Sequence, residues 1–524
     1  MLKRSLVLLV LVCILFSNVN AQSNKYWIFF KDKDTSNYDC SKTLSKQAIQ
    51  NRKDHGILLS QFSDVSLKQS YINTLSTSVG VDVVCKSKWL NGISVFMTPS
   101  QKEEVEKYAF VKEIRSIDRK LVVTSTNITV NPEYMHIAMI QMGLGTFVTE
   151  KLDGSGVNVG VIDAGFFMAQ SDTYTSHLVT EGKIKVQRDF IDPTRKDLIT
   201  VSSTAADGHG KTVLSMIGGY DEQGKVQFGM APNASYYLAR TENGDQEHHL
   251  EEDHWIMAME WMDSMGVRLI STSLGYAINM DDPKDNYTQE QMDGKTATIT
   301  KAAQIAYDQK GIFICVSAGN EGDNSAWRII SAPADAKGVL SVGATRDKYL
   351  DRISYSSIGP EALPYLKPNV SCFSPNGTSF SCPAVAGFVA CLMQKAPYMT
   401  NKELYDIITR SSHLYPFGNN YIGYGVPQAD RALELIKDKD AKFEMVYEKV
   451  ITANRFKLKK LPKDLIEVIL FNKKNETIVI DQSVVSTKKR WFVGKRKLVL
   501  KRKLDVQRTT ISFPDKSVVE IIWK

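Results

Sequence analysis

The feature that most constrains the fold is a set of short apolar runs after residue 153 that alternate with helix-like stretches. The runs cover residues 157–162, 267–270, 312–316 and 339–342, and the helix-like stretches between them include 255–262 and 300–306. Apolar runs that alternate with helices predict a parallel sheet covered by helices on both faces. Ligands of such sheets bind at the carboxyl ends of the strands. We expect Asp163, Ser273 and Asn320 at these ends.

The 524 residues are enough for about three domains, and the pattern changes twice along the chain. Strand-like and helix-like segments mix in residues 22–125, which predicts a small α+β domain in which Ser100 and Glu103 form a capping box. The α/β pattern occupies residues 126–438, and short β-prone runs predict a small all-β domain over residues 439–524. A hydrophobic content of 43% with 23% charged residues excludes the disordered and membrane-spanning classes.

The N-terminus has the pattern of a secretory signal peptide over residues 1–21. Lys3 and Arg4 precede an apolar core that is too short for a membrane anchor, and small residues up to Ala21 suit cleavage. We therefore expect an exported protein that is periplasmic, on the cell surface or extracellular. Six cysteines remain after residue 21, which is too few for a disulfide framework, and the sequence does not pair them.

The basic charge of the chain is concentrated in its last 84 residues. Residues 441–524 carry 21 Lys and Arg against 9 Asp and Glu, whereas the whole chain has a net charge of only +7. Clusters such as 488–490, 495–497 and 501–503 alternate with apolar residues, as on the faces of strands. Solvated strand faces explain this pattern, and contact with an anionic cell envelope is the alternative. We expect no nucleic-acid partner, and the sequence does not indicate an oligomeric state.

Three short motifs carry residue types suited to nucleophilic catalysis. Asp163 ends an apolar run, His209 lies between glycines at the head of a helix-like stretch, and Ser379 lies near the start of another. Each has a purely structural explanation alone, namely a turn residue, a histidine in a glycine-rich turn and a helix cap. Together they supply a carboxylate, a base and a nucleophile in the order Asp, His, Ser, the order found in subtilisin.

With these residues in view, the chain resembles the subtilisin-like serine proteases, or subtilases, and in particular secreted Gram-negative members. The Gly377-Thr378-Ser379 stretch with Ser381 and Pro383 resembles the family's serine signature. Further similar motifs are His209-Gly210 with Val213, the segment 228–234, Ser317-Ala318-Gly319-Asn320-Glu321-Gly322, and Ser273-Leu274-Gly275. They occur in family order between residues 154 and 425.

The resemblance implies a serine endopeptidase that works through an acyl-enzyme. It assigns the nucleophile to Ser379, the general acid and base to His209, the orienting carboxylate to Asp163 and an oxyanion donor to Asn320. It also implies that two segments flank bound peptide: Ser273, Leu274 and Gly275, and Ser317, Ala318 and Gly319. Residues 22–125 then correspond to an inhibitory prodomain, and self-cleavage is expected within residues 118–132.

Two further expectations concern a departure from the sequence pattern of the family and the need for a metal or cofactor. Only Ser371 to Pro375 separate Val370 from the serine stretch, where the family has a longer segment, so a catalytically impaired protein that binds peptides or cell-surface material is the alternative. The histidines and acids of residues 247–254 match no metal motif and are interpreted as a solvated loop leading into a helix. We expect no cofactor; some subtilases bind structural calcium, but no calcium-loop motif occurs here.

Overall fold

The computed structural model describes residues 23–36, 38–117, 132–202, 205–243, 249–278, 286–443, 446–489 and 495–524. The predicted signal peptide and nearly all of the predicted cleavage segment lie outside these ranges. The chain divides into two compact units, one of residues 1–38 and 62–119 and the other of residues 39–61 and 120–524. Residues 39–61 thus cluster with the α/β part of the chain, although they lie within the predicted prodomain.

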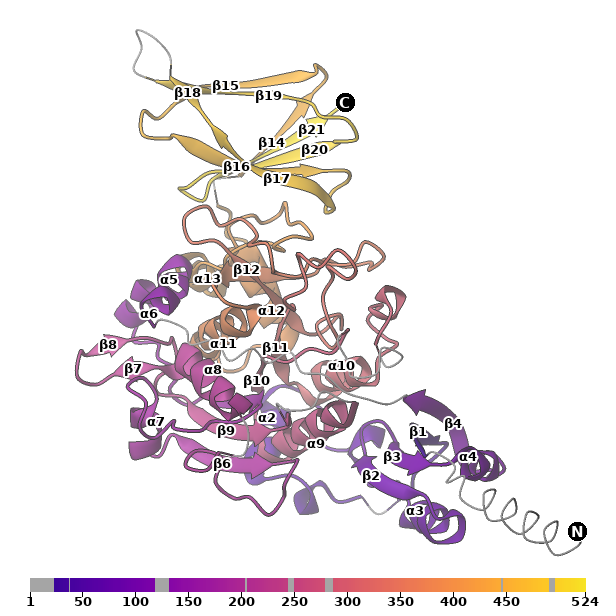
Figure 1. The fold of residues 1–524 in the computed structure, drawn as a ribbon. Helices are drawn as coiled ribbons and strands as arrows, with labels where there is room; N and C mark the ends of the chain where they lie inside the picture. Colours follow the sequence, from indigo (N-terminus) through magenta and orange to yellow (C-terminus); the bar gives the residue numbers. More distant parts are fainter. Residues whose placement is uncertain are drawn as a thin grey trace, which may run out of the picture. The chain divides into compact units, whose positions relative to one another are not determined.

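The first unit is a small α+β fold, as predicted (Figure 1). Its sheet has the strand order β2-β3-β1-β4 and consists of β1 Asn24–Phe30, β2 Asp82–Ser87, β3 Gly92–Met97 and β4 Val111–Ile117. Helices α3 Gln69–Asn73 and α4 Pro99–Val105 complete it. The predicted capping box at Ser100 is wrong by two residues: Thr98 is the N-cap and exchanges hydrogen bonds with Gln101. Proline at the first helical position explains the shift, because its missing N–H costs nothing there.

The second unit contains a seven-stranded sheet in the order β13-β12-β11-β10-β5-β9-β6, with every neighbouring pair parallel. Its strands are β5 Asn158–Asp163, β6 Ile184–Asp189, β9 Ser235–Arg240, β10 Leu269–Thr272, β11 Phe313–Ser317, β12 Leu340–Thr345 and β13 Val370–Phe373. All residues of β10 to β13 are buried. Burial on both faces explains why the predicted strands read as continuous apolar runs.

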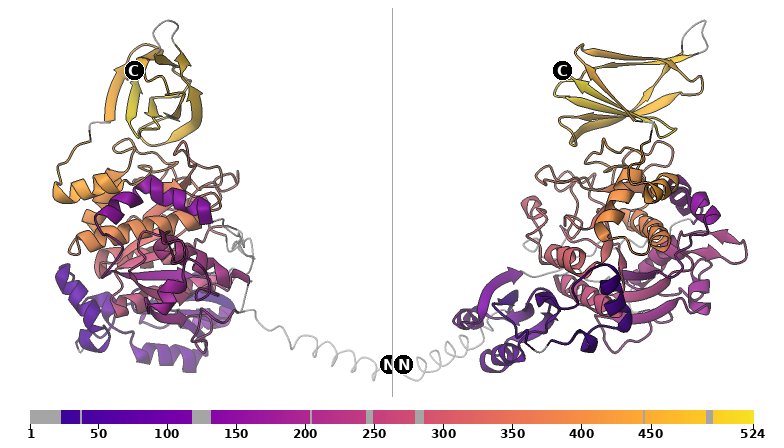
Figure 2. Two further views of the ribbon diagram at one scale, coloured as in Figure 1. Left: turned by 90° about the vertical axis from the view of Figure 1, so that its left-hand side faces the viewer. Right: turned by 180° about the vertical axis from the view of Figure 1, so that it is seen from behind.

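Helices cover both faces of this sheet (Figures 1 and 2). Helices α8 His209–Gly218 and α11 Thr378–Lys395 contact each other and the sheet, and α9 His249–Met265 and α10 Thr298–Lys310 form a second contacting pair. The remaining helices of this part are α2 Lys46–Asp54, α5 Pro132–Met142, α6 Leu144–Thr149, α7 Ser176–Thr180, α12 Asn401–Ser411 and α13 Ala429–Lys437, with a hairpin of β7 Tyr220–Asp221 and β8 Val226–Gln227. The parallel sheet covered by helices on both faces, as predicted from the sequence, is confirmed, and it is the three-layer arrangement that the resemblance to subtilisin-like proteases implies.

The described residues 446–489 and 495–524 form the predicted all-β domain, in which they make two sheets (Figure 1). One contains β14 Val446–Ile451, β16 Glu467–Lys473, β17 Val479–Ser486, β20 Arg508–Ser512 and β21 Val518–Trp523, and the other β15 Arg455–Leu461, β18 Lys488–Lys489 and β19 Arg496–Lys501. Apolar residues of this domain, including Phe471 and Val518, pack with Leu414 and Ile422 of the α/β part.

Two general observations complete the fold. Within the described residues, Cys40, Cys85, Cys315, Cys372, Cys382 and Cys391 are all free thiols, and all but Cys40 are buried. None of the helices described is both long and apolar enough to cross a membrane.

Candidate active site

Asp163 and His209 form a direct pair at the carboxyl end of strand β5. The Nδ1–H of His209 donates to Asp163 Oδ1 over 2.7 Å. Asp163 is fully buried, whereas the His209 side chain keeps 15% of its surface exposed. Burial alone would lower the pKa of His209, but the attraction and hydrogen bond of Asp163 outweigh it and raise that pKa above its ordinary value.

The close approach of α8 to β5 depends on a glycine. A Cβ on Gly210 would collide with the carbonyl of Gly165 and lie 2.9 Å from the Cβ of Asp163. Arg240, at the end of β9, donates to the carbonyl of Ala164 over 2.9 Å and also pairs with two buried aspartates. The backbone around Asp163 is therefore fixed from both neighbouring elements.

Ser379 is the second residue of α11, and the alternative that it caps this helix is wrong because Gly377 is the N-cap. Its Oγ–H donates to the carbonyl of Ser273 over 3.3 Å, and the Ser273 hydroxyl donates back to the carbonyl of Ser379 over 2.8 Å. The ring of the next residue, Phe380, lies 5.7 Å from that of His209 between centroids. The serine and the histidine therefore lie in the same site, at the ends of two contacting helices.

Asn320 is oriented by the first residue of α11. Its Oδ1 accepts from the N–H of Thr378 over 2.8 Å and from the Thr378 hydroxyl over 3.0 Å. Because both bonds use the oxygen, the amide NH₂ of this exposed side chain remains free to donate. The N–H of Ser379 is one of the first four of the helix, which have no acceptor within it. The Asn320 amide and the Ser379 N–H are therefore two hydrogen-bond donors on segments that contact each other through Thr378.

The two segments predicted to flank bound peptide also converge. Ser273, Leu274 and Gly275 follow β10. Ser317 is the last residue of β11, the adjacent parallel strand, and Ala318 and Gly319 follow it. Gly319 donates its N–H to the Thr378 hydroxyl over 3.1 Å. A Cβ on Gly275 or on Gly319 would meet the hydroxyl of Ser331. Ser331 therefore lies between the two segments, a position that no sequence motif indicated.

The short connection before the serine is tightly held. Strand β13 leads through Ser374 directly to Gly377, and the Ser374 hydroxyl donates to the carbonyl of Gly377 over 2.6 Å. The Tyr355 hydroxyl donates to the carbonyl of Ser374, also over 2.6 Å. Ser374 is 1% exposed. The shortened segment is thus an ordered turn that sets where α11 begins.

A second carboxylate lies close to the pair and was missed in the sequence. Glu242 follows β9 and is buried; it accepts from the Tyr276 hydroxyl over 2.7 Å and is hydrogen-bonded by Glu251. Burial and the repulsion of Asp163 raise the pKa of Glu242 to about 7, against hydrogen bonds that lower it. Its negative charge in turn helps to raise the pKa of His209. Only the register of β9 beside β5 brings it here, and no local motif reveals that register.

The interpretation of residues 247–254 as a solvated loop is wrong where the structure describes them. Glu251, Glu252 and Asp253 lie in α9 and are at most 4% exposed, so this turn of the helix is buried on several sides. His248 lies outside the described residues. No group of three metal-binding side chains occurs among the residues that the structure describes.

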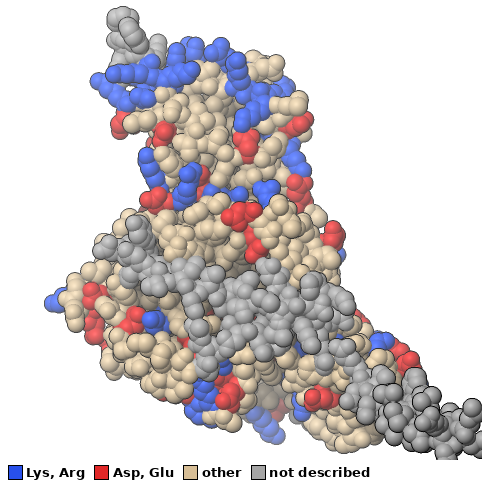
Figure 3. Space-filling model, viewed as in Figure 1, with Lys and Arg blue, Asp and Glu red and all other residues tan. Residues whose placement is uncertain are grey.

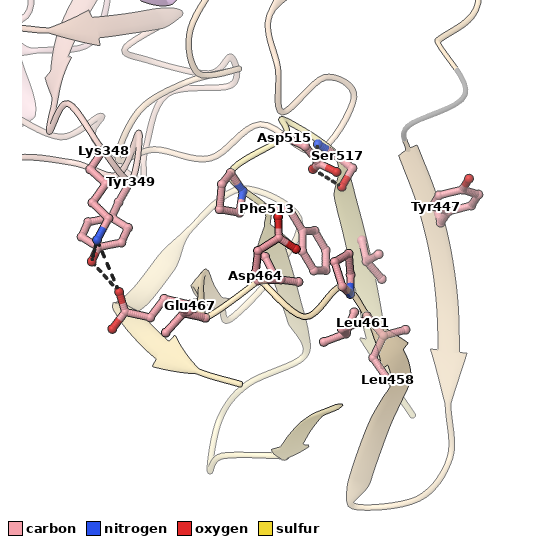
Figure 4. A pocket seen from close by; sticks show the side chains of 15 residues that line it. Lys348, Tyr349, Tyr447, Leu458, Leu461, Asp464, Glu467, Phe513, Asp515 and Ser517 are labelled. Atoms are coloured by element: carbon pink, nitrogen blue, oxygen red, sulfur yellow. Dashed lines mark hydrogen bonds and ion pairs between the residues drawn. The ribbon is translucent and has the colours of Figure 1, made fainter. Parts of the chain in front are cut away.

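A separate cavity of about 620 Å³ is lined mostly by the C-terminal β domain, with Lys348 and Tyr349 of the α/β part on one side (Figure 4). Its lining is largely apolar and includes Leu458, Leu461 and Phe513. None of the predicted site residues lines it, so it is distinct from the candidate active site.

Comparisons with known proteins agree with this geometry. A family model described as the subtilase family matches residues 154–426, which is about half of the chain. The chain belongs to the subtilase family. A second model, the peptidase S8 propeptide domain of Bacteroidota, matches residues 25–135.

The family match and the curated relatives place this subtilase among the serine-type endopeptidases. It is 28% identical over 291 residues to subtilisin DY of Bacillus licheniformis, covering 54% of this chain and 92% of the relative. It is 27% identical to subtilisin NAT of Bacillus subtilis subsp. natto, covering 54% of this chain and 66% of the relative.

Two solved structures share the fold at low identity. Fervidolysin from Fervidobacterium pennivorans, a keratinolytic enzyme related to subtilisin, aligns with a TM-score of 0.51 and 15% identity over 95% of this chain and 71% of its own. The epidermin leader peptide processing serine protease of Staphylococcus aureus aligns with a TM-score of 0.52 and 14% identity over 80% of this chain and all of its own.

Proposed function

We propose that this subtilase is an exported endopeptidase that cleaves peptide bonds through an acyl-enzyme on Ser379. The observation that carries the proposal is the buried Asp163–His209 hydrogen bond beside the N-terminus of α11, where Ser379 lies. A serine hydroxyl is a weak nucleophile until a neighbouring imidazole takes its proton. His209 accepts that proton, attack on the peptide carbonyl follows, and His209 then protonates the leaving amine.

Asp163 holds the reacting tautomer of His209 and stabilises the imidazolium that forms in the first step. The Ser379 hydroxyl bonds the Ser273 carbonyl in the structure, so rotation about its χ1 brings it toward His209. Catalytic hydrogen bonds often form only once substrate is bound. The extended peptide runs between residues 273–275 and 317–319, and the side chain before the cleaved bond points toward Ser331.

The oxygen of the tetrahedral intermediate binds to the Asn320 amide and the Ser379 N–H. Thr378 supports this role because it holds the Asn320 oxygen and so directs the NH₂ group to the site. The positive end of the α11 dipole adds to the stabilisation. No step requires a metal or cofactor, since hydroxyl, imidazole and amide groups supply all the chemistry. We expect activity to persist after treatment with a chelator.

A fluorophosphonate probe tests the proposal directly, because it reacts only with an activated serine. The processed protein should be labelled, and Ser379→Ala should abolish labelling. A processed protein that stays unlabelled would instead favour the peptide-binding alternative. The ordered turn at Ser374 argues against that alternative, since it fixes the start of α11 despite the shortened connection.

We also propose export through the signal peptide of residues 1–21 and self-cleavage within residues 118–132. Family membership and the propeptide match support a zymogen in which the propeptide inhibits the protease before release. Ser379→Ala made in a protease-free host should keep the uncut N-terminal part. The same mature N-terminus in the variant and the active protein would exclude self-processing.

Lys and Arg side chains gather on the C-terminal β domain in the view of Figure 3, and we propose that the basic face formed by β15, β19 and β18 contacts an anionic envelope surface. Lys459, Lys497 and Lys488 lie directly opposite one another across β15, β19 and β18, and Arg455 lies opposite Lys501. Like charges in direct opposition destabilise a sheet. Within the described part of the chain, no ion pair compensates these side chains. A surface of anionic headgroups would remove this repulsion.

Vesicle sedimentation tests the basic face. Binding of the full chain to vesicles rich in anionic lipid should fall with added salt. The triple change Lys459→Gln, Lys488→Gln and Lys497→Gln should remove it, and neutral vesicles should not bind. Binding that survives the triple change would contradict the proposal.

A further inference from the structure

Residues 39–61 leave the propeptide sheet between β1 and β2 and belong to the protease unit. We call this segment the strap. It contains α2, which contacts α9 (Figure 1). The whole strap falls within the propeptide match of residues 25–135. It is therefore a piece of propeptide that packs with the protease rather than with its own domain.

The centre of the strap is a buried ion pair. Arg52 Nη2 donates to both carboxylate oxygens of Asp263, over 2.8 and 3.1 Å. The two side chains are only 2% and 4% exposed. An Arg–carboxylate pair of this kind is both directional and strong once it is sealed from water. Removing one partner leaves a buried charge without compensation, which is strongly unfavourable.

Backbone contacts surround this pair. The N–H of Ser45 donates to the carbonyl of Ser264 over 2.8 Å, and the Asn51 amide donates to the carbonyl of Gly266 over 2.7 Å. A Cβ on Gly266 would lie 2.7 Å from the N of Ala48, so α2 approaches the end of α9 as closely as a glycine allows. Further along, the His55 ring bonds the carbonyl of Pro397 over 2.8 Å.

The strap lies at the amino-terminal ends of strands β10 and β11, whereas the candidate active site lies at their carboxyl ends. Its partners Gly266 and Arg268 directly precede β10, and the Gln61 amide donates to the carbonyl of Gln309, just before β11. Asp163, Ser273 and Asn320 lie at or beyond the other ends of these parallel strands. The strap therefore does not occupy the catalytic site, and cleavage of a peptide there does not disrupt its contacts.

We propose that the strap is a dedicated anchor that keeps the cleaved propeptide bound to the mature protease. After a cut within residues 118–132, the covalent link is lost but the Arg52–Asp263 pair and its surrounding contacts remain. Release of the inhibitor then requires the strap to leave the surface formed by residues 263–268 and 397–399. This inference rests on the proposed zymogen function and adds where the propeptide is held.

The test uses the full chain with Ser379→Ala and a recognition sequence for an unrelated, sequence-specific protease placed within residues 118–131. After that protease has cut the chain, the two fragments should co-elute in size-exclusion chromatography at micromolar concentration. Adding Arg52→Ala should weaken their association by at least about 100-fold. Because neither cutting nor readout uses Ser379, failure of the anchor and failure of the proposed catalysis are distinguishable.

Matched controls come from the same helix. Gln50 and Lys53 are exposed residues of α2, and the Gln50 amide donates to the Asp54 carboxylate of the same helix. Gln50→Ala and Lys53→Ala should leave association unchanged, whereas Asn51→Ala should weaken it about 3- to 10-fold through one lost hydrogen bond. Arg52→Ala fragments that associate as tightly as the parent would overturn the proposal.

A second measurement applies if Arg52→Ala does not fold. Hydrogen exchange of the cut parent complex should show α2 as protected as the end of α9. Rapid exchange of α2 within an intact complex would overturn the anchor as well. In the active chain, Asn51→Ala should shorten the lag before full activity appears, and Gln50→Ala should not.

Discussion

The two buried pairs Asp163–His209 and Arg52–Asp263 are similar in geometry and differ in the roles that we propose for them. Both join a buried aspartate to a basic side chain over 2.7 to 2.8 Å. His209 keeps 15% of its surface exposed and can gain and lose a proton as an imidazole, with its pKa raised above the ordinary value by Asp163. Arg52 is only 2% exposed, and a guanidinium does not act as a proton donor or acceptor in proteins. The contrast teaches that the basic partner and its access to solvent decide whether a pair moves a proton or holds a segment.

The largest expected effect tests the catalytic pair. Asp163→Asn should lower kcat about 10⁴-fold, because the amide cannot hold the reacting tautomer of His209. The measurement is kcat on a peptide substrate, normalised by active-site titration. Asp263→Asn in the processed enzyme should leave kcat unchanged. If both variants lost activity equally, the distinction between the two pairs would fail.

The next effect concerns the oxyanion donor beside the catalytic pair. Asn320→Ala should lower kcat about 10²- to 10³-fold with little change in KM, a range established for such a donor in subtilisin. Asp323→Ala, on the exposed part of the same loop, is the control. A loss that appeared in KM alone would show that Asn320 binds substrate without stabilising the intermediate.

The Arg52–Asp263 pair should affect the free energy of unfolding rather than kcat. In the uncut Ser379→Ala chain, Asp263→Ala should reduce the free energy of unfolding of the protease unit by about 3–5 kcal/mol, because Arg52 is left buried and unpaired. Denaturant unfolding followed by tryptophan fluorescence measures this loss. Asp54→Ala, an exposed acid on α2, should cost less than about 0.5 kcal/mol.

The smallest expected effect tests how the charge of Glu242 changes the pKa of His209 in the Asp163–His209 pair. His209 acts as a base only when neutral, and its pKa is raised in part by Glu242. Glu242→Gln removes that negative charge, so the acid limb of the kcat/KM profile should move toward lower pH. A limb that moved toward higher pH, or did not move, would contradict the electrostatic role of Glu242.

The Glu242→Gln variant should also change how the stability of the folded protein depends on pH. The pKa of Glu242 rises from an ordinary 4.5 to about 7 in the folded protein, so the folded state holds this proton more tightly. The stabilisation that the protonated Glu242 carboxyl gives the folded state is therefore present below about pH 4.5 and is lost as pH rises toward 7. Glu242→Gln should flatten that part of the stability curve, which thermal unfolding between pH 4.5 and 7 measures.

The sequence predicted the parts of the molecule that local patterns encode. Continuous apolar runs revealed β5, β10, β11 and β12, because strands buried on both faces leave no polar alternation. Short motifs indicated Asp163, His209 and Ser379, since each contains small residues and lies at the end of an element.

What the sequence did not reveal depends on contacts between distant elements. Glu242 and Glu251 looked like ordinary polar residues, and only the packing of β9 and α9 buries them. Arg52 is one of several basic residues in a polar stretch, and nothing local singles it out from Lys53. Its partner is 211 residues away, so no window along the chain contains both.

That separation has a consequence for how the chain is made. At about 5–20 residues per second, Asp263 leaves the ribosome on the order of 10 to 40 s after Arg52. During that interval Arg52 has no carboxylate from α9, and the strap has no surface on which to settle. The N-terminal part of the chain therefore completes its structure only when the middle has been synthesised. The strap is therefore synthesised before the helix α9 that it packs against, but it can form its folded contacts only afterwards.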